Sequence, residues 1–131
     1  DVKRSGEDIT VFCYGLMVNY CLQAADILAS DGIDVEVVDL RTVYPLDKAT
    51  IIERSQRTGK VLLVTEDNLE GSIMSEVSAI IAENCLFDLD APIMRLAAPD
   101  VPSMPFSPTL ENEIMMNPEK IQDKMRELAQ F

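Results

Sequence analysis

The sequence predicts an α/β protein, a three-layer α/β/α sandwich formed by a single domain over residues 1–131. Short segments rich in β-branched residues alternate with amphipathic segments of ten or more residues, which is the pattern of right-handed crossovers between parallel strands. A length of 131 residues suits one domain, and 47% hydrophobic residues can form a sizeable core. We therefore expect a mostly parallel sheet with helices on both faces.

Four segments are expected to form the strands. The first, at 9–14, is β-branched and aromatic and stops at Gly15. The other three lie at 33–40, 61–65 and 93–97, and each is followed by polar loop residues.

Apolar spacing and end signals predict the helices. Between residues 17 and 30, apolar side chains recur every three or four positions, and Asp31 with Gly32 ends the segment. Two further helices are expected at 48–56 and 72–84.

The end of the chain has the clearest helix boundary. Asn117 can cap a helix whose first position is Pro118, and the apolar pattern continues nearly to Phe131. The preceding segment, 99–108, holds four prolines and is expected to be an extended loop.

Charge and composition exclude several classes of function. Eleven Lys and Arg against 23 Asp and Glu give a net charge of −12, which disfavours nucleic acid and anionic membranes and favours a basic partner. No apolar run approaches the roughly 20 residues that span a bilayer. The absence of histidine excludes Ser-His-Asp and Cys-His catalysis by this chain alone.

Three cysteines, Cys13, Cys21 and Cys85, are odd in number and widely spaced. This spacing favours reduced, mostly buried thiols over a disulfide or a metal site.

Ligands of open parallel sheets bind beyond the carboxyl ends of the strands. There the first loop offers Gly15 alone, which matches no nucleotide fingerprint. The acidic residues Glu66, Asp67 and Glu70 could form a magnesium site or an acid/base pair, but their spacing matches no oxygen-ligand motif and favours a solvated loop. The residues alone predict no catalytic, cofactor-binding or metal-binding side chain.

Two further sets of charged residues are expected to lie in loops or at strand ends. Asp88 and Asp90 are interpreted as solvated residues, without metal. Arg41, at a strand end, could clamp a carboxylate or phosphate, but a structural pairing with a neighbouring acid such as Asp47 is favoured.

Several segments, in order, resemble a known family. Residues 8–11 read Asp-Ile-Thr-Val, 38–47 read Val-Asp-Leu-Arg-Thr-Val-Tyr-Pro-Leu-Asp, 89–95 read Leu-Asp-Ala-Pro-Ile-Met-Arg and 98–102 read Ala-Pro-Asp-Val-Pro. They resemble the transketolase-type C-terminal domain of the beta subunit of thiamine-diphosphate-dependent 2-oxo acid dehydrogenases. The wording of 70–77, Glu-Gly-Ser-Ile-Met-Ser-Glu-Val, is most similar to the branched-chain enzymes, ahead of the pyruvate and acetoin enzymes.

The resemblance implies a fold detail that periodicity does not show. It adds an edge strand near residues 2–4, antiparallel to the other four strands. The five strands then have the order 1-3-2-4-5.

The resemblance also implies an assembly and partner-docking role, without catalysis by this chain in isolation. In the family, thiamine diphosphate and Mg lie between the alpha subunit and the N-terminal domain of the beta subunit, so neither is expected to bind this chain. The start at Asp1 suggests a piece that follows the linker between the two beta-subunit domains. The expected compartment is the bacterial cytoplasm, or the mitochondrial matrix if the source is eukaryotic.

The resemblance assigns roles to four residues. Ile73 and Met74 are expected at the contact with a second beta subunit, although both could equally be core residues. Asp90 and the carboxylate of Phe131 are expected to form an anionic pocket for the basic peripheral subunit-binding domain of the acyltransferase. The structural alternatives are a turn residue at Asp90 and a frayed end at Phe131.

Two other functions remain open at this point. The chain could be the equivalent domain of transketolase or deoxyxylulose-phosphate synthase, or a free-standing α/β domain that binds a small ligand. The coding sequence immediately upstream would discriminate among all three.

Overall fold

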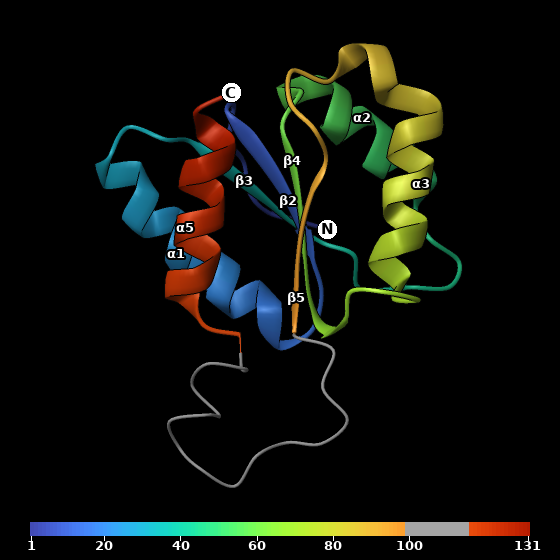
Figure 1. Cartoon of the computed structure of the whole chain (residues 1–131), viewed down its shortest axis with the longest axis horizontal. Helices are drawn as coiled ribbons and strands as arrows, with labels where there is room; N and C mark the ends of the chain where they lie inside the picture. Colours follow the sequence, from blue (N-terminus) through green and yellow to red (C-terminus); the bar gives the residue numbers. More distant parts are fainter. Residues whose placement is uncertain (99–115) are drawn as a thin grey trace, which may run out of the picture.

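The computed structural model describes residues 1–98 and 116–131 and contains a five-stranded sheet (Figure 1). The strands are β1 (Val2–Arg4), β2 (Ile9–Cys13), β3 (Val35–Asp39), β4 (Val61–Asn68) and β5 (Met94–Ala98). Their order is β1-β3-β2-β4-β5, with β1 antiparallel to β3 and the other pairs parallel. Both the predicted order and the antiparallel edge strand are confirmed.

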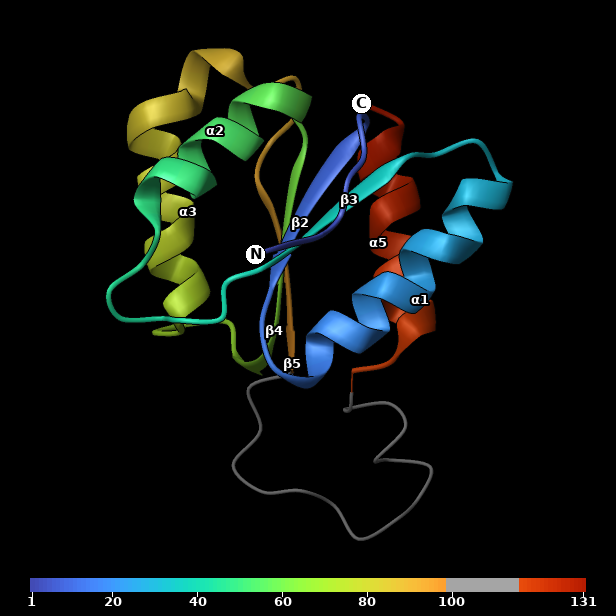
Figure 2. The ribbon, with the colours of Figure 1, turned by 180° about the vertical axis from the view of Figure 1, so that it is seen from behind.

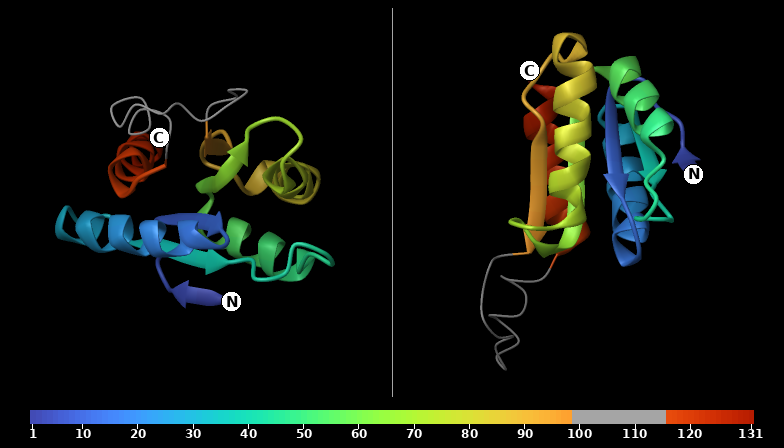
Figure 3. Two further views of the ribbon diagram at one scale, coloured as in Figure 1. Left: turned by 90° about the horizontal axis from the view of Figure 1, so that it is seen from below. Right: turned by 90° about the vertical axis from the view of Figure 1, so that its right-hand side faces the viewer.

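Helices cover the two faces of this sheet. The elements are α1 (Leu16–Ser30), α2 (Lys48–Thr58), α3 (Ile73–Cys85), α5 (Pro118–Ala129) and the short 3-10 helix η1 (Leu86–Asp88). Helices α1 and α5 lie on one face and α2 and α3 on the other, as the front and back views show (Figures 1 and 2). Seen from the right-hand side, α2 and α3 run next to each other (Figure 3). The three-layer α/β/α prediction is therefore confirmed.

The core is divided into two apolar clusters by the sheet. Successive strand residues point to opposite faces, so Val11 packs under α1 and α5 while Phe12 packs under α2 and α3. All five residues of β2 are buried, as expected for a central strand covered on both faces. Truncating Phe12, which is 0% exposed, to alanine would cost about 3–5 kcal/mol.

The end signals of two helices act as predicted. Asn117 accepts a hydrogen bond from the backbone N–H of Lys120 at 2.8 Å, and Pro118 occupies the first turn of α5. The side chain of Asp47 caps α2 by accepting from the backbone N–H of Thr50 at 3.1 Å. The predicted proline-rich loop at 99–108 lies outside the described residues.

One strand is longer than predicted. We expect 61–65 from the apolar run, but β4 continues to Asn68, which pairs with Ala98 of β5 after an irregularity in register. The last residues of β4 are exposed and polar, so hydrophobicity does not reveal them. In the described residues, every helix is too short or too polar to cross a membrane.

Candidate functional site

The predicted docking anchors and the acidic residues weighed against a metal site lie at opposite ends of the parallel strands. Asp90 precedes β5 and Phe131 follows α5, so both belong to the edge where the parallel strands begin, at the top of Figure 1. The acidic residues Glu66, Asp67 and Glu70 lie at the other edge, where β4 ends. The two edges are therefore separate candidate sites.

A cavity of about 420 Å³ opens at the end of the sheet where the parallel strands begin. Its wall includes three carboxylates, Glu7, Asp8 and Asp90, together with Lys60 and Ala129. The predicted anchor Asp90 thus shares a cavity with the last turn of α5, two residues before Phe131. Elements more than 30 residues apart in the chain are brought together here.

Asp90 is held by the residue that ends α2. Its backbone N–H donates to the Gly59 carbonyl at 2.8 Å, and a Cβ at Gly59 would lie 2.6 Å from Asp90 Oδ2. Gly59 also has φ of 70°, a left-handed conformation that glycine adopts without strain. Asp90 is therefore a turn residue, as one alternative predicted, and its exposed carboxylate still faces solvent.

The last turn of α5 is bonded in place. Lys60 Nζ donates to the Ala129 carbonyl at 3.2 Å, and the backbone N–H of Phe131 donates to the Leu128 carbonyl at 3.3 Å. The Phe131 side chain is 58% exposed. The backbone is thus hydrogen-bonded up to Phe131.

The carboxylates of this cavity differ in whether they already have ion-pair or hydrogen-bond partners within the chain. Glu7 pairs with Arg57, and Asp8 Oδ2 accepts from the backbone N–H of Asp34 at 2.8 Å. Within the described ranges, Asp90 forms no ion pair with a Lys or Arg side chain. Asp90 is therefore the carboxylate best placed to meet an added cation.

Sequence reasoning did not identify Gly59 and Lys60 as parts of this site. Gly59 could have been predicted from the sequence as the end of a helix, because glycine after a helix commonly marks its C-terminal cap. Lys60 carries no such sequence signal, since its partner is a backbone carbonyl almost 70 positions away.

At the opposite edge, three polar residues form a closed set of hydrogen bonds. Tyr14 Oη donates to Asp67 Oδ2 at 2.6 Å and contacts Thr65 Oγ1 at 3.0 Å, while the backbone N–H of Asp67 donates to Thr65 Oγ1 at 3.1 Å. Burial and the bond to Asp67 raise the pKa of Tyr14. Asp67 is thus committed to structure and is not poised as a metal ligand.

The described residues do not fit a magnesium diphosphate site. No three of their His, Cys, Asp and Glu side chains come together in a way that could hold a metal ion. Glu66, Asp67 and Glu70 are all exposed, but only Glu70 lies in a loop, because Glu66 and Asp67 belong to the last part of β4.

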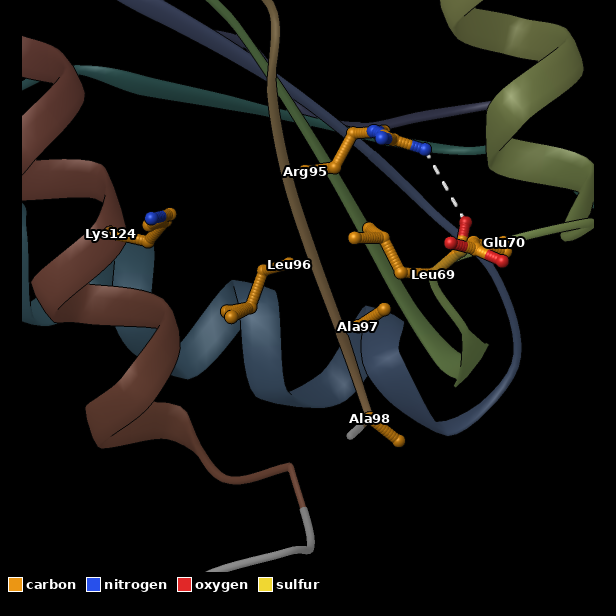
Figure 4. Close-up of a pocket in the computed structure, with 7 residues that line it drawn as sticks. All are labelled: Leu69, Glu70, Arg95, Leu96, Ala97, Ala98 and Lys124. Atoms are coloured by element: carbon orange, nitrogen blue, oxygen red, sulfur yellow. Dashed lines mark hydrogen bonds between the residues drawn. The ribbon is translucent and has the colours of Figure 1, made fainter. Parts of the chain in front are cut away.

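A second cavity, of about 320 Å³, lies beside β5 and contains two cationic side chains (Figure 4). Arg95 and Lys124 extend to opposite sides of the strand in this view, so they do not converge on one ligand. Arg95 Nη1 donates to the Leu69 carbonyl at 3.3 Å, and Lys124 pairs with Glu127 at 3.3 Å. This cavity is therefore not an anion clamp.

The two predicted interface residues differ in burial. Met74 is 1% exposed and belongs to the core under α2 and α3, whereas Ile73 is half-buried against the same cluster. Met74 therefore has almost no surface to offer a second subunit. The predicted contact remains a prediction for Ile73.

Arg41 has the predicted structural role but a different partner. Its guanidinium lies 3.6 Å from Asp1 Oδ2, and its backbone N–H donates to Asp39 Oδ1 at 2.9 Å. Asp47, the neighbouring acid given as an example, is not the partner of Arg41; the Asp47 oxygens accept hydrogen bonds from Thr50, at 3.1 and 2.7 Å.

Comparison with known proteins gives one family and several close relatives. The family model described as "Transketolase, C-terminal domain" matches residues 1–121. The beta subunit of 2-oxoisovalerate dehydrogenase from Bacillus subtilis is 67% identical over 131 residues, which is 100% of this chain and 40% of that subunit. The beta subunit of the pyruvate dehydrogenase E1 component from the same organism is 42% identical over 131 residues, with the same coverage of both chains.

A solved structure agrees with the fold. A split-gene transketolase, described as an inactive beta4 tetramer, superposes with a TM-score of 0.87 at 23% identity, covering 99% of this chain and 42% of that one. The chain therefore spans about two-fifths of the length of each of these three proteins.

Proposed function

The chain belongs to the family of transketolase C-terminal domains, and on this basis we propose that it is the C-terminal domain of the beta subunit of a 2-oxo acid dehydrogenase. The identity to two such subunits, over the whole of this chain, supports this assignment. The transketolase alternative has weaker support, because the transketolase structure reported above is only 23% identical and shows the fold alone.

The proposed substrate of the whole enzyme is a branched-chain 2-oxo acid. The chain is 67% identical to a 2-oxoisovalerate dehydrogenase subunit and 42% identical to a pyruvate dehydrogenase subunit. Assaying the assembled enzyme with 2-oxoisovalerate and pyruvate tests the substrate class. Equal or higher kcat/KM for pyruvate would contradict this part of the proposal.

The role of this domain is assembly, with the chemistry carried by other parts of the enzyme. Thiamine diphosphate with Mg would supply the decarboxylation chemistry, and we place its binding residues in the alpha subunit and in the preceding domain of the beta subunit. The described residues support this because they offer neither imidazole nor a group of ligands for the metal. Calorimetry of the chain with thiamine diphosphate and Mg²⁺ checks it, and micromolar binding would contradict it.

The docking function rests on the cavity that Asp90 shares with the last turn of α5. We propose that Asp90, with Phe131 just after α5 as the second anchor, receives Arg or Lys side chains from the basic subunit-binding domain of the acyltransferase. The exposed Asp90 carboxylate and the net charge of −12 favour such a partner.

The experiment is the affinity of the acyltransferase's subunit-binding domain for the assembled enzyme carrying Asp90→Asn. A charge-assisted contact contributes about 1.5–3 kcal/mol, so binding should weaken about tenfold or more. The matched control is Glu70→Gln, which removes one exposed negative charge at the other edge of the sheet. The effect of Asp90→Asn should shrink at high salt.

Unchanged affinity for Asp90→Asn, at low and at high salt, would show that the acyltransferase docks elsewhere. A similar loss for Glu70→Gln would mean that only the overall negative charge matters. Either result rules out the specific site at Asp90.

For subunit assembly, we propose that the start of α3 contacts a second beta subunit through Ile73, near a two-fold axis. Ile73→Asp should then reduce the mass of the assembled enzyme in light scattering. Ile27→Asp, at a 47% exposed position on α1, is the matched control. An unchanged mass with a folded domain would exclude α3 from this interface.

A further inference from the structure

We propose that Gly59 and Lys60 are positioning residues that fix the two docking anchors relative to each other. Gly59 seats Asp90, and Lys60 holds the last turn of α5, which leads to Phe131. This inference rests on the proposed docking function and adds two residues that do not themselves need to touch the partner.

The first half of the argument is the close approach of Gly59 to Asp90. The Asp90 backbone N–H donates to the Gly59 carbonyl at 2.8 Å, and any side chain at position 59 would collide with the Asp90 carboxylate, at 2.6 Å from Oδ2. A Cβ would also lie only 3.0 Å from the Asp88 carbonyl oxygen, which belongs to the backbone and yields less easily. The position of the Asp90 carboxylate thus depends on residue 59 being glycine, which has no side chain.

The second half is the contact between Lys60 and the end of α5. Lys60 Nζ donates at 3.2 Å to the carbonyl of Ala129, one of the last carbonyls of the helix, which have no partner within the helix itself. A cation is favourable at this end of a helix, where the macrodipole is negative. The ammonium group therefore ties the last turn of α5 to the start of β4.

Both contacts are made by adjacent residues, Gly59 and Lys60, whose backbone is held by the sheet. The Lys60 carbonyl accepts from the backbone N–H of Thr10 in the central strand β2 at 2.9 Å, and the next residue, Val61, is 1% exposed. Two adjacent residues on this support hold Asp90 and Ala129, which are 39 positions apart in the chain. Such preorganisation lowers the entropic cost of binding.

The charge of Lys60 makes this proposal easy to distinguish from a purely electrostatic role. As a charge alone, Lys60 would repel a basic partner, so its removal would tighten binding. As a positioning residue, its removal releases the end of α5, so binding should weaken. The two roles predict opposite signs for Lys60→Met.

The test measures the affinity of the acyltransferase's subunit-binding domain for the assembled enzyme, by calorimetry at low salt. We expect Lys60→Met to weaken binding about tenfold, as for the loss of one charge-assisted contact. Lys60→Arg keeps a cationic donor and should restore the affinity to within about twofold. Lys48→Met, at an exposed position on α2, makes the same change of net charge as a control.

The proposed role of Gly59 is tested with a separate matched pair of variants. Gly59→Ala should weaken binding about tenfold by displacing the Asp90 carboxylate. Gly71→Ala imposes the same backbone strain, since Gly71 has φ of 71° against 70° for Gly59, but its Cβ would meet nothing within 4 Å. Gly71→Ala should therefore leave the affinity unchanged.

The outcomes separate this inference from the docking function. If Asp90→Asn weakens binding while Lys60→Met binds equally or more tightly, the positioning role of Lys60 is overturned and the docking site stands. Equal effects of Gly59→Ala and Gly71→Ala would overturn the role of Gly59. If Asp90→Asn also binds unchanged, the docking function fails, and this inference fails with it.

Discussion

Tyr14 donates its phenolic hydrogen to Asp67 at 2.6 Å, which joins the residue after β2 to the end of β4. Because this hydrogen is used by Asp67, Thr65 must donate its own hydroxyl hydrogen to Tyr14 and accept from the backbone N–H of Asp67. All three groups are satisfied together. The bonds hold the acidic end of β4 in strand conformation beyond its apolar part.

We expect Tyr14→Phe to destabilise the chain by about 1 kcal/mol, the usual net value of a lost hydrogen bond. The measurement is the urea unfolding midpoint at pH 7. Tyr44→Phe is the control, because Tyr44 is 91% exposed. A loss for Tyr14→Phe no larger than that for Tyr44→Phe would contradict the structural role of the bond.

The same residue predicts a loss of stability at alkaline pH. Burial and the bond to Asp67 raise the pKa of Tyr14 above its ordinary value of 10.0. Above about pH 10 the unfolded chain releases the Tyr14 proton while the folded chain still retains it. The free energy of unfolding therefore falls as the pH rises above about 10. This part of the pH dependence should be absent in Tyr14→Phe, and its persistence there would assign it to other groups.

The sequence predicts the layers and the strand cores because their apolar side chains repeat with a clear period. Residues 17–30 show the helical repeat, and the buried run 61–65 shows the start of β4. The last part of β4 escapes this reasoning because it is exposed and is held by Tyr14 through a tertiary hydrogen bond. The antiparallel edge strand follows from resemblance, since three residues are too few for a periodic signal.

The candidate site can be predicted from the sequence only in part, because it depends on contacts between segments that are distant in the chain. The Leu-Asp-Ala-Pro segment points to Asp90, but the contact of Asp90 with Gly59 depends on a close approach between distant segments. Position in the sequence suggests Asp47 as an example of a partner for Arg41, whereas in the folded chain Asp1 is the acid beside it. Pairings between loops depend on the assembled sheet, which local patterns do not describe.

Asp47 should contribute stability that disappears at acid pH. Hydrogen bonds from the Thr50 hydroxyl and backbone N–H lower the pKa of Asp47 below its ordinary value of 3.8. The lowered pKa means that the contribution is present above about pH 4 and is lost as the pH falls further. We expect Asp47→Ala to lower the Tm at pH 7 and to have a smaller effect at pH 3.

The control for this prediction is Asp47→Asn, because asparagine also caps helices. It should retain most of the Tm at pH 7 and remove the acid dependence that comes from this residue. Equal losses for Asn and Ala at pH 7 would mean that the cap does not stabilise α2.

The three cysteines should react with thiol reagents only after unfolding. Cys13, Cys21 and Cys85 are free and buried, as predicted. The hydrogen bond with Cys13, together with burial, raises the pKa of Cys21, and burial with the nearby Asp88 raises the pKa of Cys85. The reactive thiolates of Cys21 and Cys85 are therefore scarce at pH 8, and burial shields the sulfur of all three cysteines from a reagent. Labelling with a chromogenic disulfide reagent should be slow in buffer and complete in urea, and rapid labelling of the folded chain would contradict this.

Glu36 is a buried carboxylate that organises the contact between β3 and α2. It is 0% exposed and lies 3.1 Å from Arg54 Nη1 and 2.8 Å from Arg57 Nη1. Removing one partner of a buried ion pair costs about 3–5 kcal/mol, because the remaining charge is left uncompensated. Both arginines are partly exposed, at 24% and 35%, so water reduces the penalty here.

We therefore expect Glu36→Gln to destabilise the chain by about 2–3 kcal/mol, somewhat less than for a fully buried pair. Arg54→Met should cost less, because Glu36 keeps its closer partner Arg57 and the methionine preserves most of the aliphatic packing. The order of the two urea midpoints, more than either value, tests the role of the carboxylate. If Arg54→Met were the more damaging variant, the charge of Glu36 would not be what holds α2 against the sheet.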